Sequence, residues 1–272
     1  MKGKVLIGEL GIHYEIKGEG PLLLILHGWG SSTESWQKVQ QELSSEFKVV
    51  ILDLPGFGKS ETPDQPWTIQ NYLSFLERFI QELELEDFYL IGHSFGGSLS
   101  VKLATIHPEL VRKMALIDSA GIRAKPKLIA RIVKNLAEKS ECIFMGPLIK
   151  LKRGIKKILY KLLRNTDYGK ANETMKETMK NVFDYYVPET FLKESYPKNP
   201  DNRGNFLKDL EKVDVDTLLV WGEEDKITPL RFGKIFNNKI KNSKLEVISG
   251  VGHSPHLNAT SPMVQIILNF FE

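Results

Sequence analysis

The sequence predicts an α/β domain with a doubly wound, mostly parallel sheet and an inserted helical segment. Short apolar runs typical of buried parallel strands recur at 22–26, 49–52, 88–91, 114–117, 218–221 and 245–248. Stretches of helical length and spacing lie between them, at about 35–45, 69–83, 95–107, 229–240 and 260–271. This alternation of strand and helix is typical of an open sheet that helices cover on both faces.

Two further segments complete the predicted domain organisation. Runs 4–9 and 12–16 are separated by a short Leu10-Gly11 turn, which predicts an antiparallel hairpin at the sheet edge. Residues 121–200 carry 18 Lys plus Arg and 8 Asp plus Glu, a local charge of +10 against −7 elsewhere. We therefore expect an α/β core of residues 1–120 and 211–272, with residues 121–210 inserted after the fourth parallel strand.

The composition excludes several classes of protein. A chain of 272 residues with 42% hydrophobic and 26% charged residues is globular and can bury a core without disulfides or a structural metal. Its single cysteine, Cys142, cannot close an intramolecular disulfide, and no apolar stretch has the length of a signal peptide or membrane span. The formal charge of +3 is too small to indicate nucleic acid. We therefore expect a cytoplasmic protein.

The most specific motif follows the third parallel run. In open α/β sheets the functional groups collect at the carboxyl ends of the strands. Gly92-x-Ser94-x-Gly96 stands there, between a predicted strand and a predicted helix, as a nucleophile elbow does. The two glycines allow the tight main-chain approach that lifts a serine hydroxyl clear of the backbone. The alternative is a glycine-rich turn in which Ser94 only caps the helix.

A serine nucleophile needs a histidine to take its proton and an acid to orient that histidine. His253 follows the last predicted strand and Asp225 follows the strand before it. The three residues therefore occur in the chain order Ser, Asp, His. This order predicts a catalytic triad of Ser94, Asp225 and His253.

Other acids and histidines near the strand ends are weaker candidates. Asp118 ends the strand after the elbow helix and is the alternative acid. Glu223 and Glu224 lie nearer their strand end than the favoured aspartate, which reaches further into the loop. His93 precedes the serine, and we expect its side chain to point away from the hydroxyl and to pack.

Acyl transfer also needs fixed donors for the developing oxyanion, and backbone amides meet this need because they are already oriented. The amide of Phe95 follows the predicted nucleophile. The amide of Trp29 follows His27-Gly28, in the loop after the first parallel strand. We expect these two amides to form an oxyanion hole.

Patterns that would indicate a cofactor or a metal are incomplete. The stretch 56–60 ends like a phosphate loop, but Asp53 stands where that motif needs a glycine. Glu61 stands where a dinucleotide-binding motif needs its third glycine. His107 and His256 form no helical metal-ligand pair. We therefore expect no cofactor and no metal.

Together and in this order, the motifs resemble the α/β-hydrolase superfamily, in its capped, esterase-like and proline-iminopeptidase-like branch. The resemblance covers almost the whole chain. It rests on five segments: His27-Gly28-Trp29-Gly30, Asp53-Leu54-Pro55-Gly56-Phe57-Gly58-Lys59-Ser60, Gly92-His93-Ser94-Phe95-Gly96-Gly97, Trp221-Gly222-Glu223-Glu224-Asp225 and Gly250-Val251-Gly252-His253. It implies the α/β-hydrolase fold, a helical cap inserted after the strand that ends near Ile117, and no cofactor.

The resemblance also narrows the activity. Haloalkane dehalogenases and epoxide hydrolases carry aspartate where this chain has Ser94, and carbon–carbon bond hydrolases usually differ at His93 and Ser254. A cap of charge +10 disfavours the ammonium substrate of an iminopeptidase. We therefore expect a serine carboxylesterase that cleaves an ester or thioester of a small or lipid-like molecule. The alternatives are a receptor-like protein that binds a small molecule with slow or no turnover, a C–C hydrolase and an iminopeptidase.

The basic segment contains a candidate amphipathic helix. Apolar residues recur at helical spacing from Leu148 to Leu162, with lysine and arginine between them. Such a helix could lie on an anionic membrane or lipid surface. We expect instead a cap helix whose apolar side covers the active site and whose basic side faces solvent.

Overall fold

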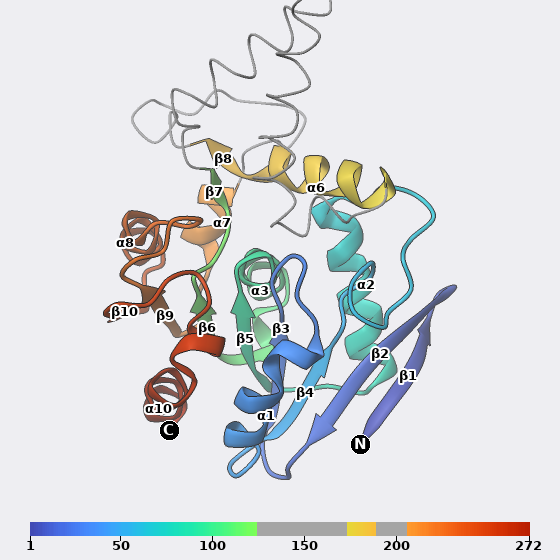
Figure 1. Cartoon of the computed structure of the whole chain (residues 1–272), viewed down its shortest axis with the longest axis horizontal. Coiled ribbons are helices and arrows are strands. Elements are labelled where there is room, and N and C mark those ends of the chain that lie inside the picture. Colours follow the sequence, from blue (N-terminus) through green and yellow to red (C-terminus); the bar gives the residue numbers. More distant parts are fainter. Residues whose placement is uncertain (124–172, 189–205) are drawn as a thin grey trace, which may run out of the picture.

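The computed structural model describes residues 1–123, 173–188 and 206–272. These residues contain an eight-stranded sheet with the strand order β1-β2-β4-β3-β5-β6-β9-β10 (Figure 1). The strands are β1 (Lys2–Ile7), β2 (Leu10–Lys17), β3 (Leu22–Leu26), β4 (Lys48–Leu52), β5 (Phe88–His93), β6 (Val111–Ile117), β9 (Thr217–Gly222) and β10 (Ser243–Ile248). All neighbouring pairs from β4 to β10 are parallel, and β2 is antiparallel to β1 and β4. The predicted mostly parallel sheet is confirmed.

Helices cover both faces of the sheet. On one face lie α1 (Gln37–Leu43), which continues the 3-10 turn η1 (Thr33–Trp36), and α10 (Thr260–Phe271). The other face is covered by α2 (Ile69–Glu82), α3 (Phe95–Ile106), α7 (Phe206–Lys212) and α8 (Leu230–Lys239). Two short helices, η2 (Pro108–Leu110) and α9 (Pro255–Asn258), lie in the loops of the described α/β domain.

The parallel strands are apolar at nearly every position because both of their faces are buried. In β3, Leu24 and Leu26 belong to the core cluster with α2 and α3, whereas Leu23 and Ile25 belong to the cluster with α1 and α10. This is the two-residue period of a strand. The sequence therefore shows these strands as continuous apolar runs rather than as alternating patterns.

The N-terminal hairpin forms as predicted, but its turn lies two residues earlier. Ile7 pairs with Leu10, so Gly8 and Glu9 make the turn, and Leu10 and Gly11 belong to β2. Gly8 has a φ of +63°, the left-handed conformation that the first position of such a two-residue turn requires. The prediction of a Leu10-Gly11 turn was wrong because it ignored this requirement.

Among the described residues, four elements lie between β6 and β9, where the sequence predicts an insert: β7 (Ile122–Arg123), α6 (Glu173–Tyr185), β8 (Val187–Pro188) and α7. The side chain of Thr178 in α6 accepts a hydrogen bond from the backbone N–H of Trp67 at 2.9 Å. The Tyr186 hydroxyl is hydrogen-bonded to Ser98 Oγ of α3 at 2.8 Å. The predicted basic amphipathic helix from Leu148 to Leu162 lies outside the described residues.

A membrane span would need a longer and more apolar helix than any that the structure describes.

Candidate active site

The turn between β5 and α3 has the geometry of a nucleophile elbow. Ser94 has φ 49° and ψ −113°, a strained conformation for a residue with a side chain. Its side chain makes no capping hydrogen bond to α3, so the alternative in which it only caps the helix is wrong. Phe95 opens α3, and the first amides of a helix have no partner within the helix.

The two glycines of the motif are needed because other atoms approach them closely. A Cβ on Gly96 would lie 2.1 Å from the carbonyl oxygen of Leu26 in β3. A Cβ on Gly92 would lie 2.3 Å from Ser100 Oγ and 2.7 Å from the Gly96 carbonyl oxygen. Glycine at these two positions therefore lets α3 pack directly against the ends of β3 and β5.

The structure brings together the three side chains that the sequence predicts as a triad. The Ser94 hydroxyl lies 3.0 Å from Nε2 of His253. On the other side of the ring, Nδ1–H of His253 donates to Oδ2 of Asp225 at 2.7 Å. Histidine in this arrangement has one nitrogen free to accept the serine proton, because the carboxylate holds the hydrogen on the other.

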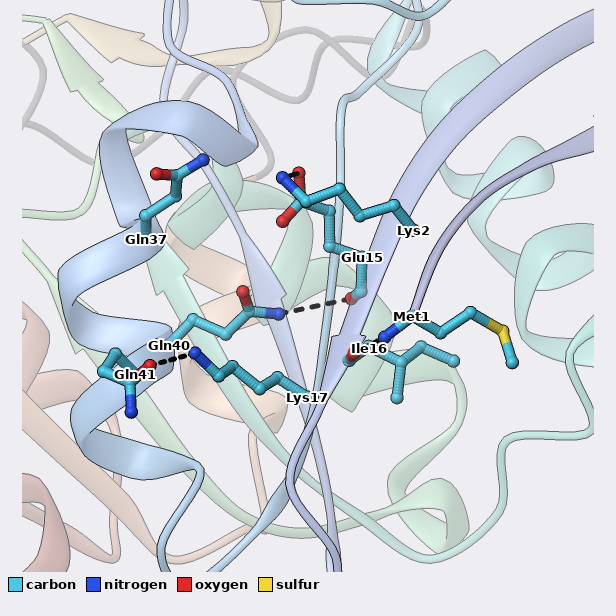
Figure 2. A pocket seen from close by; sticks show the side chains of 8 residues that line it. All are labelled: Met1, Lys2, Glu15, Ile16, Lys17, Gln37, Gln40 and Gln41. Carbon is cyan, nitrogen blue, oxygen red and sulfur yellow. Dashed lines mark hydrogen bonds and ion pairs between the residues drawn. The ribbon is translucent and has the colours of Figure 1, made fainter.

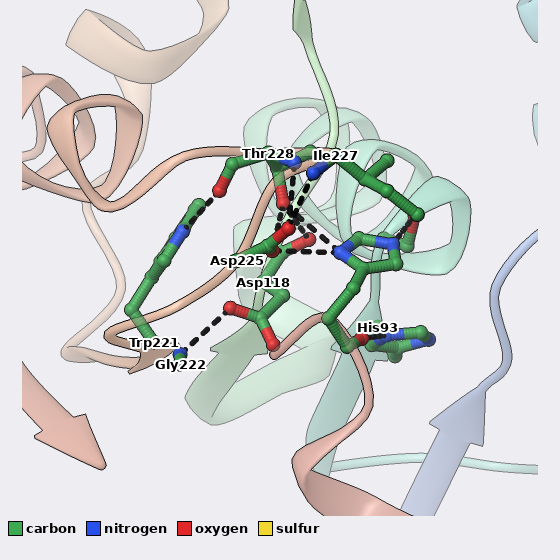
Figure 3. Close-up of polar contacts among 9 residues, drawn as sticks. His93, Asp118, Trp221, Gly222, Asp225, Ile227 and Thr228 are labelled. Atoms are coloured by element: carbon green, nitrogen blue, oxygen red, sulfur yellow. Dashed lines mark hydrogen bonds and ion pairs between the residues drawn. The ribbon is translucent and has the colours of Figure 1, made fainter. Parts of the chain in front are cut away.

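Asp225 is held as an anion by several donors (Figure 3). Its Oδ1 accepts the backbone N–H groups of Ile227 at 2.7 Å and Thr228 at 3.0 Å, and its Oδ2 accepts the Thr228 hydroxyl at 2.7 Å. Burial raises the pKa of this carboxyl, but the bonds from His253 and Thr228 outweigh it and the pKa is lowered. The sequence reasoning missed Thr228, although an aspartate in a loop is known to accept the backbone N–H two residues on, as Asp225 does from Ile227.

Asp118, the alternative acid, is fully buried and does not pair with the histidine. Its Oδ1 accepts the Gly222 N–H at 2.9 Å, and its Oδ2 has no hydrogen-bond partner among the described residues (Figure 3). Burial, with the nearby charge of Asp225, raises its pKa to about 9. Glu223 and Glu224 are exposed. Of the four candidate acids, only Asp225 is hydrogen-bonded to the histidine in the described part of the chain.

The loop after β3 orients the amide of Trp29. The Gly28 carbonyl oxygen accepts the Ser31 N–H at 3.2 Å and Nδ1–H of His27 at 2.7 Å. His27 is itself fixed, since its Nε2 accepts the Leu54 N–H at 2.9 Å. In a trans peptide the carbonyl and the next N–H point in opposite directions, so these bonds turn the Trp29 N–H away from His27.

The family model described as "alpha/beta hydrolase fold" matches residues 21–260 of the chain. The chain belongs to the α/β-hydrolase fold family. The resemblance seen in the sequence motifs is thereby confirmed.

The proteins that it resembles at low identity include an esterase, a lipase and a meta-cleavage product hydrolase. This α/β-hydrolase is 25% identical over 270 residues to the pimeloyl-[acyl-carrier protein] methyl ester esterase of Legionella pneumophila (strain Paris), covering 97% of this chain and 100% of the relative. It is 24% identical over 260 residues to the monoacylglycerol lipase ABHD6 of Mus musculus, covering 93% and 76%. The solved meta-cleavage product hydrolase CumD of Pseudomonas fluorescens IP01 has a TM-score of 0.70 at 21% identity, covering 99% and 97%.

Two more histidines of this α/β-hydrolase lie near His253. The His256 ring stacks on Trp36 with a centroid distance of 4.5 Å, and the His93 ring lies 4.5 Å from His256 and 5.0 Å from His253. Burial, followed by the charge of His253 when protonated, lowers the pKa of His256 to about 4. The expectation that His93 packs is correct but incomplete, because its ring also makes a hydrogen bond. His107 lies apart from this cluster and pairs with glutamates.

Three side chains near Ser94 form a group that could hold a metal ion. His93, Asp118 and His253 each offer one ligand atom, and these atoms lie within 4.8 Å of one another. Both ring nitrogens of His253 are already engaged, with Asp225 and with Ser94. A metal bound here would have to displace the hydrogen bonds of His253 with Ser94 and Asp225.

The glycine-rich stretch 56–60 serves as a turn in this α/β-hydrolase. Asp53 is buried, and its carboxylate accepts the Thr33 N–H at 2.6 Å and the Lys59 N–H at 2.8 Å. A Cβ on Gly58 would lie 2.3 Å from that carboxylate. The aspartate that breaks the phosphate-loop motif is therefore the residue around which the turn closes.

A separate hollow of about 400 Å³ lies between the N-terminal hairpin and α1 (Figure 2). It contains no residue of the predicted triad or oxyanion hole. Its lining is mostly polar and consists of Met1, Lys2, Glu15, Ile16, Lys17, Gln37, Gln40 and Gln41.

Proposed function

We propose that this α/β-hydrolase is a serine hydrolase that cleaves a carboxylic ester or thioester of a small or lipid-like molecule through an acyl-enzyme. The observation that carries the proposal is the continuous hydrogen-bonded chain from Ser94 Oγ through His253 to Asp225. The three residues follow β5, β10 and β9, at the carboxyl ends of parallel strands. In this fold the reactive groups are expected at that edge of the sheet.

The first half of the reaction forms the acyl-enzyme. Ser94 Oγ attacks the carbonyl carbon while its proton passes to Nε2 of His253. Asp225 stabilises the resulting imidazolium through the bond to Nδ1–H. The carbonyl oxygen becomes an oxyanion, which the backbone amides of Trp29 and Phe95 would stabilise by donation.

The second half regenerates the enzyme. The tetrahedral intermediate collapses, and the imidazolium of His253 gives its proton to the departing alcohol or thiol. Water then attacks the acyl carbon while His253 accepts a proton from it, and the acid leaves as Ser94 recovers its hydrogen. Every proton that moves in this scheme passes through Nε2 of one histidine, so no cofactor is required.

Two observations support a carboxylic ester as the substrate. An esterase and a lipase are among the sequence relatives, at identities of 24–25%. The charge of +10 on residues 121–200 disfavours a substrate ammonium and is compatible with a neutral or anionic ester.

A panel of p-nitrophenyl esters of rising acyl length tests the proposal. We expect turnover by the wild type, and a loss of several orders of magnitude in Ser94→Ala, because that variant lacks the nucleophile. If the wild type turns over none of the panel but binds small molecules tightly, the receptor-like alternative is favoured. Turnover that survives in Ser94→Ala would refute the assignment of the nucleophile.

Covalent labelling gives an independent test of the same residue. A fluorophosphonate should phosphonylate Ser94, because an activated hydroxyl attacks such electrophiles and an ordinary serine does not. Mass spectrometry of the digested protein should find the adduct on the peptide that contains Ser94. An inactivated enzyme with Ser94 unmodified would contradict the proposal.

A further inference from the structure

His93 makes a hydrogen bond that links the nucleophile elbow to the loop of the histidine base. Its Nε2 lies 2.8 Å from the backbone carbonyl oxygen of His253. A carbonyl oxygen can only accept, so the hydrogen of this contact is on His93 Nε2. The backbone of His93 ends β5 and directly precedes Ser94. One side chain therefore connects the chain segment of the nucleophile to that of the base.

We propose that His93 is a positioning residue, whose Nε2–H holds the His253 carbonyl and so keeps the imidazole of His253 within reach of Ser94. This inference rests on the proposed serine-hydrolase function. It assigns to His93 a role beyond packing.

The surroundings of His93 leave its ring little freedom to move. A Cβ on Gly28 would lie 2.7 Å from His93 Nδ1, so the ring fits directly against the backbone of the loop after β3. On its other sides lie the rings of His256, His253 and Trp36, with centroids 4.5, 5.0 and 6.1 Å away. A ring enclosed in this way is a rigid support for the atom to which it donates.

The electrostatics keep the donor in one protonation state. Burial, followed by the charges that His256 and His253 would carry when protonated, holds the pKa of His93 well below its usual range. His93 therefore stays neutral while His253 gains and loses a proton during turnover. A neutral imidazole has one N–H, and the bond to His253 fixes it on Nε2.

Packing alone does not explain an imidazole at this position. The Nδ1 atom of His93 is buried and has no hydrogen-bond partner among the described residues. A buried polar atom without a partner destabilises the fold, which an apolar side chain of the same length would avoid. The bond from Nε2 to the His253 carbonyl is the contribution that an apolar side chain cannot make.

A matched pair of variants separates positioning from packing. Glutamine reaches as far as histidine and carries an N–H donor where His93 has Nε2, whereas methionine has the same length and ends in a methyl group. We expect His93→Gln to keep kcat within about five-fold of wild type. We expect His93→Met to lower kcat about 10²-fold with little change in KM, the loss typical of a reactive group displaced by about 1 Å.

The rate of phosphonylation of Ser94 by a fluorophosphonate is the decisive readout, because it depends on the base but not on the natural substrate. It should fall in His93→Met and recover in His93→Gln, with thermal unfolding confirming that both variants are folded. Equal rates in the two variants would refute the positioning role while leaving the proposed function intact. A wild type that is not labelled would overturn the proposed function and this inference together.

An NMR measurement on the wild type requires no variant. Nitrogen-15 shifts of the imidazoles should show His93 neutral and protonated on Nε2 between about pH 6 and 9. A hydrogen on Nδ1 instead would exclude the donation to His253 and overturn the inference, even if His93→Met does not fold.

Discussion

Replacing Asp225 by asparagine should nearly abolish catalysis without unfolding the protein. Oδ1 of Asp225 accepts two backbone N–H groups, from Ile227 and Thr228, while Oδ2 faces Nδ1 of His253. In the variant the amide oxygen should keep the two backbone donors, which turns the NH2 group toward His253. His253 then accepts at Nδ1 and carries its hydrogen on Nε2, where it cannot take the proton of Ser94.

The size of the effect follows from the loss of the base. In a serine protease the same change lowers kcat by about 10⁴, which corresponds to about 5.4 kcal/mol of transition-state stabilisation. We expect a similar loss here, since the 2.7 Å bond from His253 to Asp225 is the same type of contact. KM should change little, because the substituted atom faces the histidine rather than the substrate.

Asp118→Asn is the matched control, because Asp118 is the second buried aspartate of the site. With a pKa of about 9 it is already protonated at neutral pH. In the described part of the chain its carboxyl makes one hydrogen bond, from Gly222 N–H, which an amide oxygen can accept equally well. Kinetics with a p-nitrophenyl ester should therefore show near wild-type kcat in this variant, with no loss of thermal stability. A crippled Asp118→Asn beside a mildly affected Asp225→Asn would refute the assignment of the acid.

Three further predictions concern stability, metals and the insert. His256 stays neutral in the fold with a pKa of about 4, so below its ordinary value of 6.5 the unfolded state binds the extra proton and the fold loses stability as the pH falls. At pH 5 this amounts to about 2 kcal/mol, and urea unfolding at pH 5 and 7 should show that His256→Phe is less acid-sensitive by that amount. EDTA should leave ester hydrolysis unchanged, and a loss that a divalent cation restores would contradict the metal-free mechanism. Reversing Lys156, Lys157 and Lys161 to glutamate should change turnover of a neutral ester only a few-fold, because the cap interpretation expects these charges to face solvent, where they are screened. Binding of the wild type to anionic vesicles at physiological salt, lost in that triple variant, would contradict the cap interpretation.

The sheet and the candidate site at its strand ends could be predicted from sequence because their signals are local. Buried parallel strands appear as apolar runs, and the residue that follows such a run must lie at the carboxyl edge. Ser94, Asp225 and His253 were found in this way, and the structure places their side chains in contact. The position of the hairpin turn was also readable, since Gly8 supplies the positive φ, but the prediction gave more weight to the apolar pattern.

The supporting contacts could not be predicted because they join residues far apart in the chain. The bond from His93 to the His253 carbonyl spans 160 positions. No periodicity or local motif encodes such a contact, which depends on how the loops after β5 and β10 approach each other. The sequence shows that a histidine precedes Ser94, but only the folded structure shows that this histidine donates to the His253 carbonyl.

The choice between the two aspartates also depends on contacts that only the folded structure shows. Both Asp118 and Asp225 follow parallel strands, and two carboxyls close together in a buried site do not ionise with equal ease. Asp225 keeps its charge because two backbone N–H groups, the Thr228 hydroxyl and His253 donate to it. The carboxyl of Asp118 accepts one hydrogen bond from the described residues, that of the Gly222 N–H, and keeps its proton instead. The number of donors that the folded loops supply therefore decides which carboxylate can serve His253, and a sequence shows the carboxylates without showing those donors.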